Sequence, residues 1–462
     1  KVTFREKFPE KNNRLMPDLP GAQPHLSLGY TTFSPVFVAE ELRKHRTSPS
    51  APPAPSTDNL GAVAATYEFS RTRLWMNTVF PASEAENWFV SGTAAYWNIL
   101  NALPADRRGA MAALRDGLAD MNARLAYTMD REGPLAPLRA TRQYDGFKSY
   151  TIPRIRGTFL LHQMRVLLGN DTFSRLMLDI HTRFREKPMT TAEFVAAAER
   201  IAGKSLRPFI MQWLERDDLP SPHAEFSSRQ EGGRWRVQLN VRQEGVPYLF
   251  QASVAIDTVG GTLWLPVSVD GPAWTASWTV GAEPRAFRFN AGRDIPTTTG
   301  KFFTFANFFD EFSHARIVYG TSRLVEGQHT LALRLQTTLA DAFTETLTPL
   351  RKDSEVDPAE LAQGDLIVLG GPADNVLADT LARAAGLDAG RNLFRWQGGT
   401  YADPDDGLFL ALPNPWNRSR AVYWFIGNSA LELSSMLKRP TGLPGWARFK
   451  GEQVVERGYA LD

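Results

Sequence analysis

Residues 157–173 read GTFLLHQMRVLLGNDTF, the stretch of this 462-residue chain that says most about its fold. Leu160, Met164, Leu167 and Leu168 recur here at the spacing of one helical face. A helix with a single apolar stripe buries that stripe against neighbouring elements. The stretch therefore predicts a helix inside a packed, mostly helical domain.

Hydrophobic periodicity divides the rest of the chain and predicts a multidomain α/β protein. After Pro222, the apolar residues Val237, Leu239 and Val241 alternate with polar ones, which is typical of strands in a β-sandwich. From about residue 301, apolar runs alternate with helical stripes, which predicts a largely parallel, covered sheet. The predicted domains are residues 1–222, mostly helical with a Pro-rich loop at 47–57; residues 223–298, a β-sandwich; residues 299–440, an α/β module; and residues 441–462, a C-terminal tail.

Composition excludes several classes of function. The chain has 52 Lys and Arg residues and 50 Asp and Glu residues. Its net charge therefore does not indicate nucleic acid or an anionic membrane as a partner. The absence of Cys excludes disulfides, thiolate zinc sites and a Cys nucleophile. No apolar run approaches the length of a membrane span. We expect an exported bacterial protein, in the periplasm, secreted or at the cell surface, and we interpret Lys1 as the start of a mature or excised chain.

Residues 87–97 read NWFVSGTAAYW and resemble the segment of the aminopeptidase N family that carries the third zinc ligand. The 157–173 stretch is similar to a later helix of the same family, and residues 189–194, 203–213 and 219–220 follow in family order and spacing. The resemblance covers about residues 20–222. It implies the thermolysin-like fold of a gluzincin metallopeptidase.

The residues that would hold zinc in that family are replaced here. Residues 69–75 read FSRTRLW where the family has His-Glu-x-x-His-x-Trp. Two His one helical turn apart share a zinc ion, and the Glu beside them acts as general base. By the resemblance, Phe69, Ser70, Arg73 and Ser91 occupy the relic zinc-site positions, and Arg154 replaces the Tyr that stabilises the oxyanion. We expect no catalytic residue, no metal and no cofactor at these positions.

Two interpretations of the arginines stay open. Arg73 and Arg154 replace groups that point at the same spot in the family fold, and guanidinium groups suit carboxylate or phosphate. In the first interpretation, the two arginines bind a small anion in the relic cleft, which is the cleft that holds zinc in the family. In the other interpretation, they pair with nearby acids such as Glu68 and Glu86.

The favoured function is a catalytically inactive aminopeptidase N-like protein with a binding or scaffolding role in a larger assembly. The family's helical domain packs against an N-terminal β domain, and fewer residues precede Phe69 than that domain needs. We therefore expect a protein partner, or a missing N-terminal portion of a longer chain, to cover the face of the helical domain against which the β domain packs in the family.

The alternative is a hydrolase whose chemistry was rebuilt outside the zinc site, or an anion- or peptide-binding protein that uses the relic cleft. Residues 370–375 and 414–417 loosely resemble a flavodoxin-like accessory module of bacterial secreted hydrolases. A rebuilt hydrolase needs a His beside Ser322 or Ser429. His314 and His329 are the candidates in that module.

Overall fold

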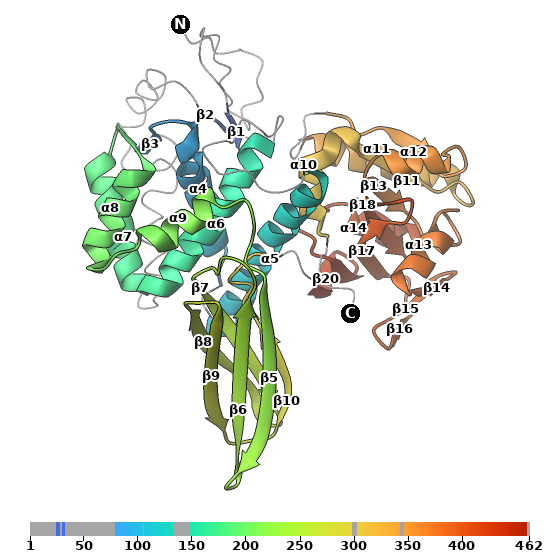
Figure 1. Ribbon diagram of the computed structural model, residues 1–462. Helices are drawn as coiled ribbons and strands as arrows, with labels where there is room; N and C mark the ends of the chain where they lie inside the picture. Colours follow the sequence, from blue (N-terminus) through green and yellow to red (C-terminus); the bar gives the residue numbers. More distant parts are fainter. Residues whose placement is uncertain are drawn as a thin grey trace, which may run out of the picture. The chain divides into compact units, whose positions relative to one another are not determined.

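The computed structural model describes residues 25–27, 30–32, 79–104, 106–132, 148–297, 303–341 and 346–459. The chain divides into two compact units, drawn in Figure 1 with colours that follow the sequence. Unit 1 comprises residues 1–122 and 134–299, and unit 2 comprises residues 123–133 and 300–462. Within the described ranges, no helix has both the length and the apolar character that a membrane crossing requires.

Unit 1 begins with a mostly helical part, as the sequence predicts. Helix α8 illustrates the local signals: Thr190 and Glu193 form a capping box at its start, and Gly203 ends it with φ +67°. Leu160 and Met164 of the predicted stripe are fully buried on α6. The elements are β1 His25–Ser27, β2 Tyr30–Thr32, β3 Val79–Pro81, α4 Asn87–Asn101, α5 Arg107–Glu132, α6 Lys148–Leu168, α7 Asn170–Phe184, β4 Lys187–Met189, α8 Thr191–Ala202 and α9 Arg207–Glu215.

Two three-stranded antiparallel sheets complete unit 1, in the orders β5-β6-β9 and β10-β7-β8. Val237, Leu239 and Val241 of β6 are buried while Arg236 and Gln238 are exposed, as their alternation predicts. The buried residues of these sheets and of the helices form one continuous apolar core. The strands are β5 Pro222–Glu231, β6 Arg234–Gln243, β7 Phe250–Thr258, β8 Gly261–Val269, β9 Ala273–Val280 and β10 Pro284–Phe289.

Unit 2 contains a seven-stranded sheet in the order β12-β11-β13-β18-β17-β19-β20. The first four of these strands are parallel, and the pairings from β18 to β20 are antiparallel. A small antiparallel sheet, β14-β15-β16, is separate. The strands are β11 Arg316–Tyr319, β12 Leu350–Lys352, β13 Leu366–Leu369, β14 Asp388–Gly390, β15 Leu393–Trp396, β16 Gly399–Tyr401, β17 Asp406–Asn414, β18 Asn417–Gly427, β19 Trp446–Lys450 and β20 Gln453–Gly458.

Helices cover both faces of the seven-stranded sheet. Leu335 of α11 and Leu433 of α14 share one apolar core with one face. Leu361 of α12 and Leu381 of α13 belong to the core on the opposite face. We call the ends of β11, β13 and β18, with the first turns of α11 and α14, the carboxyl edge. The helices are α10 Phe308–Glu311, α11 Val325–Leu339, α12 Pro358–Gln363, α13 Ala378–Ala385 and α14 Ala430–Met436.

The C-terminal residues differ from their prediction as a tail. Within residues 441–462, β19 pairs with β17 and β20 pairs with β19, so this segment extends the sheet. The sequence of β19, WARFK, mixes apolar and charged residues and lacks the continuous apolar run of a central strand. An edge strand of this kind is hard to recognise from periodicity.

The division between the two units falls within α5. Residues 123–133 belong to unit 2, although the sequence placed them in the helical domain. Arg124 makes a buried bidentate ion pair with Asp310, at 2.8 and 2.5 Å. Tyr127 donates to Asp365, and Tyr423 donates to the same carboxyl at 3.2 Å. Burial raises the pKa of Asp365 to about 6.

Candidate functional site

The close packing of α4 against α6 positions two of the predicted site residues. A Cβ atom on Gly157 of α6 would lie 2.1 Å from the backbone oxygen of Trp88 on α4. A Cβ on Gly92 would lie 2.6 Å from the backbone of Gly157. Glycine at both positions therefore lets the two backbones touch. Ser91 lies next to Gly92 on α4, and Arg154 lies three residues before Gly157 on α6.

Ser91, at the predicted third-ligand position, is buried with 1% of its surface exposed. Its Oγ donates to the backbone oxygen of Asn87, one turn earlier in α4, at 2.5 Å. A serine that bonds back to its own helix has its donor satisfied locally. Ser91 therefore acts as a structural residue of α4 and presents no carboxylate to a metal.

Arg154 is also buried. Phe69, Ser70 and Arg73 lie outside the described residues, so an anion site built from Arg73 and Arg154 stays a prediction. The same holds for a pairing with Glu68. Glu86 is described, and its carboxylate accepts hydrogen bonds from Ser83 Oγ at 2.5 Å and from the backbone nitrogen of Thr191 at 3.4 Å.

A buried polar network that the sequence did not reveal lies beside these helices. Tyr96 Oη and His162 Nδ1 are 3.1 Å apart, and His162 Nε2 lies 2.9 Å from Asp294 Oδ1. Ser253 donates to Asp294 Oδ2 through its backbone nitrogen at 2.8 Å and its hydroxyl at 2.6 Å. Arg165 donates to Tyr96 Oη at 3.0 Å. The network connects α4 and α6 to β7 and to the loop after β10.

The charges of this network are matched internally. Burial acts to raise the pKa of Asp294, but its bonds to His162 and Ser253 outweigh burial and hold that pKa below its usual value. Tyr96 and His162 each expose only 1% of their surface, so no substrate reaches them in this arrangement. These residues lie up to 198 positions apart in the chain, so no local motif could have indicated that they contact one another. We interpret the network as a structural connection inside unit 1.

The predicted serine candidates of unit 2 have structural roles. Ser429 caps α14: its Oγ donates to Pro404 O at 2.7 Å and accepts from Glu432 N at 3.1 Å. The backbone nitrogen of Ser322 donates to Asp374 O. No hydrogen bond within the described ranges joins either serine to a histidine.

The two histidines of the module make other contacts. The ring of His329 packs on Tyr319, with centroids 5.2 Å apart. His314 uses the same atom, Nδ1, to contact both Ser313 at 3.1 Å and Glu311 at 3.5 Å. In a serine triad, one ring nitrogen of the histidine takes the proton of the serine while the N–H of the other nitrogen donates to the acid, so both ring nitrogens are used. His314 is therefore not arranged as a catalytic base.

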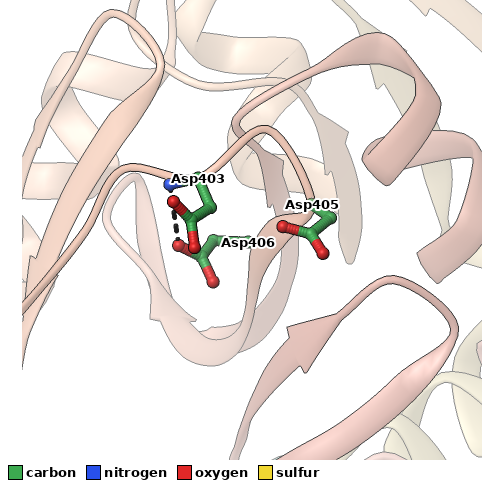
Figure 2. Close-up of side chains that lie close together, drawn as sticks. All are labelled: Asp403, Asp405 and Asp406. Carbon is green, nitrogen blue, oxygen red and sulfur yellow. Dashed lines mark hydrogen bonds between the residues drawn. The ribbon is translucent and has the colours of Figure 1, made fainter.

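An acidic loop, Asp403, Asp405 and Asp406, brings three carboxylates within 4.8 Å of one another at the start of β17 (Figure 2). Asp403 and Asp406 are joined by a backbone-to-carboxylate bond of 2.9 Å. Lys450 of β19 contacts all three, at 2.5, 2.9 and 3.4 Å. Its bonds to Asp403 and Asp405 raise the pKa of Lys450 above its usual range. The ammonium thus offsets much of the charge that would attract a metal ion.

No family model matches this chain, and no curated protein matches it either. Solved structures with similarity include aminopeptidase A of Legionella pneumophila in complex with aspartic acid. That match has 11% identity and a TM-score of 0.38, and covers 71% of this chain and 36% of the other. A mutant M1 zinc metallopeptidase of Deinococcus radiodurans, bound to a Tyr-Ser-Ala substrate, matches at 22% identity and a TM-score of 0.27, over 36% of this chain and 35% of the other. The chain thus spans little more than a third of the length of either structure.

Proposed function

We propose that this chain is a catalytically inactive relative of the aminopeptidase N family that serves as a binding or scaffolding part of a larger assembly. The observation that carries the proposal is Ser91. It stands at the position of the third zinc ligand, and its hydroxyl bonds to its own helix. A metallopeptidase of this family needs a carboxylate there.

The other substitutions of the family pattern support the loss of zinc chemistry. A catalytic zinc needs three protein ligands that donate through nitrogen, sulfur or carboxylate oxygen. Phe69 and Ser91 supply none of these, and Arg73 brings a positive charge that opposes a cation. Ser70 cannot replace a glutamate base, and Arg154 cannot replace the phenol of a tyrosine.

The alternative of a rebuilt hydrolase receives no support from the described serines. Ser429 is engaged as a helix cap, and His314 and His329 contact other groups. We therefore propose a binding function for the chain. The proposal includes a role outside the cytoplasm, in keeping with a chain that has no Cys.

Unit 2 would be an accessory module of this assembly. Numbered along the chain, its parallel strands β11, β12, β13 and β18 lie in the order 2-1-3-4. This order is that of the corresponding strands in flavodoxin-like sheets, which supports the proposed flavodoxin-like module. The partner would be the remainder of a longer polypeptide, a second subunit or another copy of this chain.

Hydrolysis assays test the loss of catalysis. The purified chain, with and without added zinc, is given a panel of aminoacyl p-nitroanilides and p-nitrophenyl esters. We expect no turnover above that of the heat-denatured chain. Zinc-dependent release of p-nitroaniline would contradict the proposal. Ester hydrolysis that disappears in Ser429→Ala would establish the rebuilt hydrolase instead.

The assembly is tested separately, by light scattering after size-exclusion chromatography and by cross-linking in the source organism. We expect defined cross-links from unit 1 to one partner, or a discrete oligomer of the chain. A monodisperse monomer without reproducible cross-links would contradict the scaffolding role, whatever the hydrolysis assays show.

A further inference from the structure

A cavity of about 340 Å³ opens at the carboxyl edge of unit 2. The first turns of α11 and α14 line it, with Leu324, Gln328 and Leu331 on one side and Ala430 on the other. In open parallel sheets, ligands bind beyond the carboxyl ends of the strands, where successive helices leave on opposite faces. Here α11 and α13 follow adjacent strands and pack on opposite faces. The cavity lies beside this crevice, between α11 and α14, which both pack on one face of the sheet.

Gln328 indicates what the cavity lacks. The residue is 3% exposed, and its Oε1 is buried without a hydrogen-bond partner among the described residues. A buried amide oxygen without a donor is costly, so such groups are rare in native structures. Thr330 also lines the cavity, and its hydroxyl already donates to the backbone oxygen of Glu326 at 2.8 Å. An N–H donor brought by a ligand would complete the site.

Exposed apolar side chains lie at the cavity and next to its lining residues in the chain. Leu324 and Val325 are 62% and 37% exposed, and Leu431, next to Ala430, is 78% exposed. Leu324 also has a φ of +47°, a left-handed conformation that is unfavourable for a leucine. Large apolar side chains exposed around a hollow are typical of a surface that a partner covers.

The chemistry of the lining disfavours an anionic ligand. The N-terminus of a helix attracts phosphates, but the first turn of α11 carries Glu326, which lines the cavity. Ligand pockets usually measure about 300–1,000 Å³, so a volume near the lower end suits a compact group rather than a dinucleotide. An apolar side chain followed by a peptide N–H satisfies both the lining and Gln328.

We propose that the carboxyl edge of unit 2 binds an apolar peptide segment of a protein partner. A leucine-sized side chain of that segment enters the cavity, and a neighbouring peptide N–H donates to Gln328 Oε1. Leu324, Val325 and Leu431 cover the rest of the segment. This proposal does not depend on the loss of zinc chemistry in unit 1.

The test uses N-acetyl-leucyl-leucinamide as the probe and saturation-transfer NMR on the full chain. We expect saturable binding of this probe and none of N-acetyl-seryl-serinamide. Ala430 is exposed, so Ala430→Trp should fold normally and abolish binding by closing the cavity. Leu431→Ser should weaken binding. The matched control is Leu347→Ser, a leucine 61% exposed just before β12, which should leave binding unchanged.

A chemical cycle tests the hydrogen bond itself. An analogue of the probe with methylated peptide nitrogens should bind the wild-type chain about tenfold more weakly. Gln328→Met keeps the side-chain volume but removes the acceptor, so it should bind both probes equally. Equal signals from wild type and Ala430→Trp, or equal binding of the leucyl and seryl probes, would overturn the proposal. Persistence of the tenfold preference in Gln328→Met would overturn the role of the amide oxygen.

Discussion

Ser91 and Asp294 in the α4–α6 region of unit 1 differ in their hydrogen bonding from Gln328 and Glu432 at the carboxyl edge of unit 2. In the first, Ser91 bonds to its own helix and Asp294 is held by His162 and Ser253. In the second, the buried oxygens Gln328 Oε1 and Glu432 Oε1 have no partner among the described residues. A group satisfied from within has a structural role, whereas an unsatisfied oxygen on a residue that lines a cavity, as in Gln328, can accept a hydrogen bond from a ligand.

On this comparison, the carboxyl edge of unit 2 is a better candidate for a binding site than the relic zinc-site positions. The helical region resembles a peptidase in sequence, but Ser91 and Asp294 there are committed to internal contacts. Unit 2 carries no motif of that clarity, yet it has the open cavity and the perturbed acid Glu432. The sequence resemblance therefore gives no indication of this cavity.

The largest expected effect is at the contact of α4 with α6. A Cβ at residue 157 would lie 2.1 Å from Trp88 O, a backbone atom that cannot yield without moving α4. Gly157→Ala should lower the free energy of unfolding by about 3 kcal/mol, measured by urea denaturation. Gly281→Ala, which adds its Cβ in open space, should change it by less than about 0.5 kcal/mol. Equal effects would show that the contact is loose.

A smaller effect is expected from the buried network of unit 1. The lowered pKa of Asp294 means that its ionised form is preferred in the folded chain. Its contribution is present above the pKa of the unfolded chain and is lost as pH falls through the folded pKa. Asp294→Asn should cost about 2 kcal/mol at pH 7 and progressively less below pH ~4. A cost that is independent of pH would contradict the preference of the folded chain for ionised Asp294.

Glu432 should behave in the opposite way. Burial, together with Asp405 and Asp406, raises its pKa to about 7. Between the unfolded and folded pKa values, the unfolded chain releases a proton that the folded chain retains, so the cost of Glu432 grows with pH. Glu432→Gln should stabilise the chain by about 1 kcal/mol at pH 8 and change nothing at pH ~4. Destabilisation at pH 8 would show that the carboxylate has a partner in solution.

The smallest expected effect is at Ser91. Its hydroxyl donates to the Asn87 carbonyl of its own helix, and such bonds add little to the stability of a helix. Ser91→Ala should change the free energy of unfolding by less than about 0.5 kcal/mol, since alanine favours helix. A loss of several kcal/mol would mean that Ser91 makes a contact beyond its helix.

Periodicity predicted the regular elements well. The stripe from Leu160 to Leu168 lies in α6, and the apolar run Leu366–Leu369 is a central parallel strand. Continuous apolar runs and stripes report burial directly. Mixed strands such as β19, and a helix such as α5 that belongs to both units, carry no such signal.

The candidate sites could be predicted only in part. The family resemblance assigned Ser91 and Arg154 to zinc-site and oxyanion positions, and the structure shows that their helices touch each other. Contacts between distant residues decide the partners of His162, the ion pairs of Lys450 with the acidic loop and the surroundings of Gln328 Oε1. These contacts could not be predicted from a single sequence, because they form only when the chain folds.

The central claim is that the α4–α6 region no longer holds a catalytic zinc, and zinc stoichiometry tests it most directly. The chain is loaded with zinc, passed through gel filtration and analysed by elemental mass spectrometry. An Asp405→Asn, Asp406→Asn variant removes the acidic loop as a competing site. We predict substoichiometric zinc that falls further in this variant. One tightly held zinc per chain that survives in the variant would contradict the claim.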